Sequence, residues 1–136
     1  PDGSGALLLD GDEVLEAGWA NVFAVRDGVL RTPPLDGRIL PGTTRRTVLR
    51  IAAEEDLEVA EEPLSREDLL AAGEVFLTGS VRGVEGAVEL DGAPLAGRGE
   101  LSRRVAAELR RRWRLPEPRA AAPVPAGGPR PGRSAR

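Results

Sequence analysis

Three short segments carry side chains that could together bind a phosphorylated ligand. They are EAGWANVF at residues 16–23, TPPLDGRILPGTTR at 32–45 and EVFLTGSVRGV at 74–84. The second segment ends where a helix is expected to begin, and free backbone N–H groups at a helix start, beside two hydroxyls, favour an anion. Gly79 and Ser80 offer a second N–H and hydroxyl group, and Glu16 offers a carboxylate that needs a cationic or N–H partner if it is buried. The pattern indicates a phosphate cradle with a carboxylate some distance away, which suits a phosphorylated cofactor that contains nitrogen.

Each of these features also has an ordinary structural explanation. Glu16 stands at the end of an apolar stretch, where a solvated strand-edge residue is common. Thr43 or Thr44 fits the N-cap position of the following helix, and Gly79-Ser80 is typical of a turn. The residues alone therefore leave both explanations open.

The elements that must position these segments alternate between short strands and helices. Roughly seven strands are expected, at 6–9, 13–16, 21–25, 29–31, 57–60, 74–78 and 84–90. Three helices are expected, at 43–54, from Ser65 up to a stop at Gly73, and at 101–113. Ser65 and Asp68 have the spacing of a capping box. The sequence predicts an α+β domain over residues 1–114, followed by a Pro/Ala/Arg-rich tail, 115–136, that we expect to be disordered.

Composition excludes several kinds of chemistry. The chain has no cysteine and no histidine, so disulfides and the commonest metal ligands are missing, and no metal site is expected. It also has no lysine and no tyrosine. The first 114 residues carry a net charge of −6, which argues against nucleic-acid binding, and no apolar run reaches the length of a membrane span. The expected location is cytoplasmic. Because the chain begins with Pro1 and holds no methionine, we expect it to be a segment of something longer.

The motifs E-x4-N-x-F, T-P-P, L-P-G-x-T-R and E-V-F-x-T-x-S occur in this order between about Asp10 and Arg112. In this combination the chain resembles the class IV aminotransferase family, the fold-type IV pyridoxal-phosphate enzymes. The resemblance implies the C-terminal large domain of the D-amino-acid-aminotransferase-like fold, a mixed, strand-rich pseudo-barrel with about three helices. It also implies pyridoxal 5′-phosphate as the cofactor.

The resemblance implies a role for each matching cofactor residue. Glu16 would pair with the pyridine nitrogen and keep it protonated, which maintains the ring as an electron sink. Leu40 would pack against the ring face. Thr43 and Thr44 would bind the phosphate at the helix start, and Ser80 would add a hydroxyl.

Four further residues receive weaker assignments. Val81 and Arg82 are candidates for substrate binding, although an arginine at this position is more often solvated unless it faces a carboxylate. Asn21 and Arg45 match the family motifs, and we interpret them as structural.

Within the family, the details favour aminodeoxychorismate lyase. Branched-chain aminotransferases usually have G-E-N before the aromatic residue and G-T-A-A-E after the buried strand. This chain has WAN at 19–21 and GSVRG at 79–83. These stretches resemble the lyase domain fused behind the chorismate-binding component of 4-aminobenzoate synthase, which releases 4-aminobenzoate and pyruvate on the route to folate. A branched-chain or D-amino-acid aminotransferase is the alternative.

The departure from the family pattern is the missing lysine. The family's catalytic lysine lies upstream of the glutamate, and this chain contains no lysine. No catalytic residue is therefore expected among these 136 residues. We therefore expect a fragment that is inactive alone and works with a missing N-terminal domain or a fused chorismate-binding component, commonly as a homodimer. The alternative to an enzyme domain is a non-catalytic remnant that binds the cofactor or serves as a dimerisation surface.

Overall fold

The computed structural model describes residues 5–114, so the expected disordered tail at 115–136 lies outside the described residues. The helices are α1 (Thr43–Glu54), α2 (Arg66–Ala71) and α3 (Glu100–Trp113). The strands are β1 (Leu7–Asp10), β2 (Glu13–Ala17), β3 (Ala20–Arg26), β4 (Val29–Thr32), β5 (Val59–Glu61), β6 (Leu64–Ser65), β7 (Glu74–Gly79), β8 (Gly83–Gly86), β9 (Glu89–Leu90) and β10 (Ala93–Pro94). The predicted α+β class with three helices is confirmed.

Eight strands form one sheet around the long central strand β3. Strands β1 to β5 follow one another in order, β7 pairs with β3 and β8, and β6 pairs with β2. All of these pairs are antiparallel except β4 with β5. Strands β9 and β10 make a separate two-stranded sheet. Because β3 pairs with β2, β4 and β7, it connects the segments that carry the three motifs.

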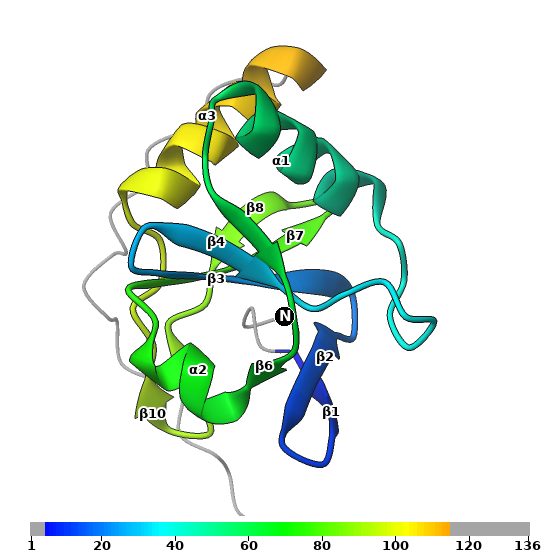
Figure 1. The fold of residues 1–136 in the computed structure, drawn as a ribbon, viewed down its shortest axis with the longest axis vertical. Helices are drawn as coiled ribbons and strands as arrows, with labels where there is room; N and C mark the ends of the chain where they lie inside the picture. The colour runs from blue at the N-terminus through cyan, green and yellow to red at the C-terminus, as the bar shows by residue number, and fades with distance from the viewer. Residues whose placement is uncertain (1–4, 115–136) are drawn as a thin grey trace, which may run out of the picture.

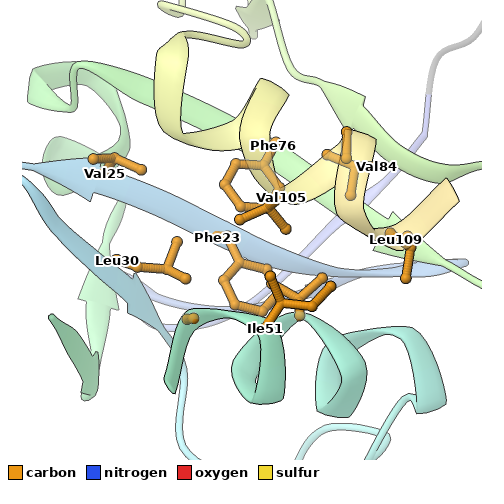
Figure 2. Close-up of a cluster of buried hydrophobic side chains, with 11 residues drawn as sticks. Phe23, Val25, Leu30, Ile51, Phe76, Val84, Val105 and Leu109 are labelled. Carbon is orange, nitrogen blue, oxygen red and sulfur yellow. The ribbon is translucent and has the colours of Figure 1, made fainter. Parts of the chain in front are cut away.

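The two faces of β3 bury different side chains, because successive residues of a strand point to opposite faces. Phe23 and Val25 pack with α1 and α3, and the ring of Phe23 stacks on that of Phe76 of β7, with 5.1 Å between the ring centroids. Val22 and Ala24 lie in a second cluster on the other face. Figure 1 shows α1 and α3 side by side over the sheet, with α2 on the opposite side. Figure 2 shows the first cluster enclosed between the sheet and these two helices.

Local sequence signals account for the helices. Helix α1 buries Val48, Ile51 and Ala52 at the spacing of one helical face. Helix α2 begins with the predicted capping box, because the Ser65 hydroxyl accepts a hydrogen bond from the Asp68 N–H and the Asp68 carboxylate accepts one from the Ser65 N–H.

The strand count and several strand boundaries differ from the prediction, and the largest difference lies at 84–90. Ten short strands are present in the described residues instead of about seven. The single strand expected at 84–90 ends at Gly86 and resumes only as β9. The Ala87 N–H still bonds to the Val75 carbonyl, but the Val75 N–H bonds to Gly97 at 2.8 Å, so a later segment takes over the pairing with β7. No helix in residues 5–114 is long and apolar enough to cross a membrane.

Candidate functional site

A cavity of about 200 Å³ lies where α1 begins beside the ends of β2 and β7. Its lining comes from all three motif segments. The five residues predicted to contact the cofactor all line it: Glu16, Leu40, Thr43, Thr44 and Ser80. Three segments that are far apart in the sequence therefore converge on one small hollow.

A cross-strand row of polar side chains forms the floor of this cavity. Glu16 of β2 is the direct partner of Asn21 on β3, and Asn21 is the direct partner of Thr78 on β7. Residues directly opposite one another on neighbouring strands place their side chains on the same face. The three side chains consequently share the face of the sheet on which α1 begins.

The carboxylate of Glu16 is half-buried and faces the loop before α1. Its Oε2 atom accepts a hydrogen bond from the Leu40 N–H at 3.0 Å. The Asn21 amide donates to the carbonyl of the same Leu40 at 2.9 Å. The acid is therefore held against the loop that precedes α1.

Helix α1 begins without a side-chain cap, which corrects the expectation that Thr43 or Thr44 caps it. Gly42 occupies the N-cap position, and no side chain caps the helix start by accepting a hydrogen bond from its first N–H groups. The first N–H groups of a helix have no partner inside the helix. Here they are left for a ligand or solvent, because the threonines stand one and two residues inside the helix, where their hydroxyls do not reach back to cap it.

Two buried hydroxyls at the cavity have no hydrogen-bond partner. The side chains of Thr44 and Thr78 belong to residues that are 2% and 1% exposed, and the Oγ1 atom of each is buried and unpaired. A hydroxyl buried without a partner costs about 1–3 kcal/mol. Both residues line the cavity between the start of α1 and the end of β7, so the unpaired hydroxyls lie beside the place where the free N–H groups of the helix attract an anion, and the lining fits a phosphate-sized group.

Thr78 was not among the predicted site residues. Thr78 is the threonine of the E-V-F-x-T-x-S motif, which could have indicated it, but the motif was interpreted there only as a buried strand. Its position beside Asn21 in the cavity lining depends on the register of β3 with β7, which the sequence did not reveal.

Val81 and Arg82 do not line the cavity. The side chain of Val81 is 93% exposed. The guanidinium of Arg82 stacks over the ring of Trp19, a lining residue, at 5.0 Å from the ring centroid, and also approaches Glu85 at 3.5 Å. Arg82 thus lies next to a wall residue, and no contact here tests its predicted role in substrate binding.

The loop that carries Leu40 is also held by ion pairs of Arg38 with the β1–β2 hairpin. Arg38 forms ion pairs with Asp36, Glu13 and Asp10, at 2.6, 2.6 and 3.0 Å. Hydrogen bonding to Glu13 and Asp36 raises the pKa of the Arg38 guanidinium above its usual value. Arg38 ties the loop to the β1–β2 hairpin, which also contains Glu16.

Arg45 behaves as the structural residue that we expected. Its guanidinium is buried, donates to the Pro33 carbonyl at 3.0 Å and pairs with Glu61 at 2.7 Å. These contacts join α1 to the start of the loop and to β5. They do not reach the cavity lining.

A larger hollow of about 510 Å³ lies against the other face of the sheet, among Leu7, Val22, Leu69, Val75 and Leu77. Its lining includes no serine or threonine and no helix start. Convergent polar groups are what orient a ligand in a pocket. We therefore assign the candidate site to the smaller cavity.

Comparison with known proteins agrees with this fold and with the motifs. The sequence pattern of the family Amino-transferase class IV matches residues 3–90. The chain belongs to the class IV aminotransferase family.

The relatives include both kinds of enzyme considered from the sequence. A branched-chain-amino-acid aminotransferase of Escherichia coli is 42% identical over 79 residues, which cover 58% of this chain and 26% of that protein. The crystal structure of a branched-chain aminotransferase from Thermoproteus uzoniensis with norvaline is 39% identical, with a TM-score of 0.74 over 79% of this chain and 36% of that one. The 4-amino-4-deoxychorismate lyase from Pseudomonas aeruginosa is 31% identical, with a TM-score of 0.75 over 79% and 40%. The chain spans less than half the length of the curated relatives it matches.

A further structural relative bears on the ligand. This branched-chain amino acid aminotransferase was solved with pyridoxamine 5′-phosphate, and it is 34% identical to this chain with a TM-score of 0.73. That relative therefore binds a phosphorylated pyridine.

Proposed function

We propose that this chain is the cofactor-holding part of a pyridoxal 5′-phosphate enzyme. The main support is the convergence of the Glu16 carboxylate, the uncapped start of α1 and the end of β7 on one cavity. The two unpaired buried hydroxyls at this point add to it, because a phosphate supplies the acceptors that they lack.

Each part of the lining has a distinct task in this proposal. The phosphate lies at the start of α1, where Thr43 and Thr44 and the free N–H groups bind it, and Ser80 adds a hydroxyl. Leu40, whose side chain is 72% exposed, packs against the ring. Glu16 holds a proton on the ring nitrogen. When bound, the cofactor supplies an electron-withdrawing pyridinium ring that stabilises negative charge next to the reacting amino group.

Catalysis requires a lysine, which these 136 residues do not contain. We infer that a lysine-bearing N-terminal part, or a fused chorismate-binding component, completes the site, and that the complete enzyme is a cytoplasmic homodimer. The competing proposal is a non-catalytic module that keeps the cradle without the chemistry. Both proposals predict that the cofactor binds, and only the first predicts turnover once a lysine is supplied.

For the reaction itself, transamination of a branched-chain amino acid has the stronger support. The chain is more similar in sequence to the aminotransferases, at 39% and 42% identity, than to the Pseudomonas aeruginosa lyase, at 31%. Lysis of 4-amino-4-deoxychorismate is the second candidate. It is supported by an equally close match of fold, with a TM-score of 0.75, and by the GSVRG stretch at 79–83, which departs from the usual aminotransferase pattern.

Binding is tested directly on this chain with pyridoxamine 5′-phosphate, which needs no lysine. Calorimetric titration should show saturable binding by the wild type. Glu16→Gln should weaken it about tenfold, because the amide no longer attracts a protonated ring nitrogen. Glu58→Gln, at an exposed site outside the cavity, is the matched control. Absence of binding by the wild type, or equal affinities of wild type and Glu16→Gln, would contradict the proposal.

The reaction is tested on this chain joined to a lysine-bearing N-terminal part. Transfer of the amino group from a branched-chain amino acid to 2-oxoglutarate supports the aminotransferase. Release of pyruvate from 4-amino-4-deoxychorismate supports the lyase. Cofactor binding with neither activity supports the non-catalytic module.

A further inference from the structure

We propose that Asn21 is a positioning residue of this site: its amide fixes Leu40 so that the Leu40 N–H holds one oxygen of Glu16 and leaves the other for the ligand. The inference rests on the proposed binding of a phosphorylated pyridine. It goes further by giving a task to a residue that does not itself need to touch the ligand.

Asn21 lies at the centre of the polar row under the cavity. It is 5% exposed, and its direct cross-strand partners are Glu16 and Thr78. A buried amide is retained at low cost only if its polar atoms are paired. In Asn21 the Nδ2 atom is paired with the Leu40 carbonyl at 2.9 Å.

The oxygen of the Asn21 amide also contacts the loop. The Oδ1 atom of Asn21 occupies the space beside Gly42 that a side chain would need, so that any Cβ on residue 42 would collide with it. Gly42 is the N-cap of α1. One side chain therefore contacts both the loop residue that binds Glu16 and the residue at which the proposed phosphate site begins.

Leu40 transmits this position to the carboxylate. Its carbonyl accepts from the Asn21 amide and from the Gly42 N–H, each at 2.9 Å, and its N–H donates to Glu16 Oε2 at 3.0 Å. Within residues 5–114, the Glu16 side chain makes this single hydrogen bond. The second oxygen is free for a protonated ring nitrogen, and its direction depends on where the Leu40 N–H stands.

Asn21 is not the only residue that holds this loop among the described residues. Arg38 also ties the loop to Glu13 and Asp10 of the β1–β2 hairpin, and Arg45 holds the first part of the loop through Pro33. The specific effect of the Asn21 bond is therefore local orientation of Leu40. This distinguishes a positioning residue from one that only stabilises the domain.

The test compares Asn21→Ala with Thr32→Val in the full 136-residue chain. Thr32 is a matched control because its buried hydroxyl also donates to a backbone carbonyl, that of Val22 at 2.7 Å, yet Thr32 does not line the cavity. Asn21→Ser, which stays polar but is too short to reach Leu40, replaces Asn21→Ala if the latter does not fold. Circular dichroism establishes folding and the melting temperature of each variant.

The probe is pyridoxamine 5′-phosphate labelled with ¹⁵N in the ring. Calorimetry measures its affinity, and the ¹⁵N shift across pH measures when the bound ring nitrogen loses its proton. We expect both substitutions to lower the melting temperature similarly. Asn21→Ala should also weaken binding about tenfold, the factor for one lost hydrogen bond, and let the ring lose its proton at lower pH. Thr32→Val should leave affinity and ring titration unchanged.

Two results would overturn the inference in distinguishable ways. If the wild type binds but Asn21→Ala loses no more affinity than Thr32→Val and titrates like the wild type, Asn21 has only a structural role and the proposed function stands. If the wild type shows no saturable binding, the proposed function fails, and the inference fails with it.

Discussion

The carboxylate of Glu74 on β7 accepts a hydrogen bond from the hydroxyl of Ser102 at 2.9 Å and from the Ser102 N–H at 3.2 Å. Both groups are buried. One free N–H group of the first turn of α3, that of Ser102, is thus satisfied by a side chain of β7, and a Cβ at position 99 would collide with that side chain, so glycine leaves room for the approach. Strand β7, which brings Thr78 to the cavity, is fixed to α3 by this contact.

Glu74→Ala should therefore destabilise the chain. Removal of a buried, charge-assisted acceptor leaves the Ser102 N–H unpaired, although the Ser102 hydroxyl keeps its hydrogen bonds with Gly99, and is expected to lower the free energy of unfolding by about 2 kcal/mol. Urea denaturation measures the change. Glu58→Ala, at an exposed position, should change it by less than about 0.5 kcal/mol. Equal effects of the two substitutions would show that Glu74 does not hold α3.

Gly42→Ala should be costly only while Asn21 is present. The backbone of Gly42, at φ −59° and ψ 140°, suits alanine, so the obstacle is the collision of the new Cβ with the Asn21 amide. We expect a loss of about 1–3 kcal/mol of stability. In the Asn21→Ala background the loss should be much smaller, and a double-mutant cycle by urea denaturation measures this coupling. Gly73→Ala, where the new Cβ has room at 3.6 Å from its nearest neighbour, is the control. Additive effects of the two site substitutions would contradict the packing described for Gly42.

Thr78→Val should separate stability from binding. The substitution removes a buried hydroxyl that has no partner in the free chain, so the free chain should be as stable as the wild type or more stable. Binding of pyridoxamine 5′-phosphate should weaken, because the same hydroxyl is available to the phosphate. Thermal melts with and without the ligand measure both effects.

Thr47→Val provides the comparison for Thr78→Val. Its hydroxyl donates to the Thr43 carbonyl within α1 and does not line the cavity. This variant should leave the affinity unchanged. A Thr78→Val chain that is less stable yet binds normally would assign the hydroxyl to the fold instead of to the ligand.

Glu108 makes part of the stability of α3 dependent on pH. Hydrogen bonds from Arg111 and Arg112 lower the pKa of the Glu108 carboxyl from 4.5 to about 2. Because the folded state holds this proton less tightly than the unfolded state, the contribution is fully present above pH 4.5 and is lost as the pH falls toward 2. Glu108→Gln should thus melt below the wild type at pH 7, and the two melting temperatures should converge near pH 2. A constant difference across this range would contradict the ion pairs.

Local sequence was sufficient to predict the features that depend only on residues close together in the chain. The helix at Thr43–Glu54 and the Ser65–Asp68 capping box were predicted, because helical periodicity and capping act over three or four residues. The family motifs also led to the five candidate cofactor residues that line the cavity.

Tertiary structure decided how those residues meet. Asn21 lies between Glu16 and Thr78 only because β3 pairs with β2 and β7 in one particular register, and a shift of one residue would turn the row to the other face of the sheet. The need for glycine at the N-cap position 42 also comes from Asn21, a residue distant in the sequence, because a Cβ there would collide with its amide. Contacts between residues distant in sequence are set by the packing of the whole sheet against α1 and α3, and no local pattern records them.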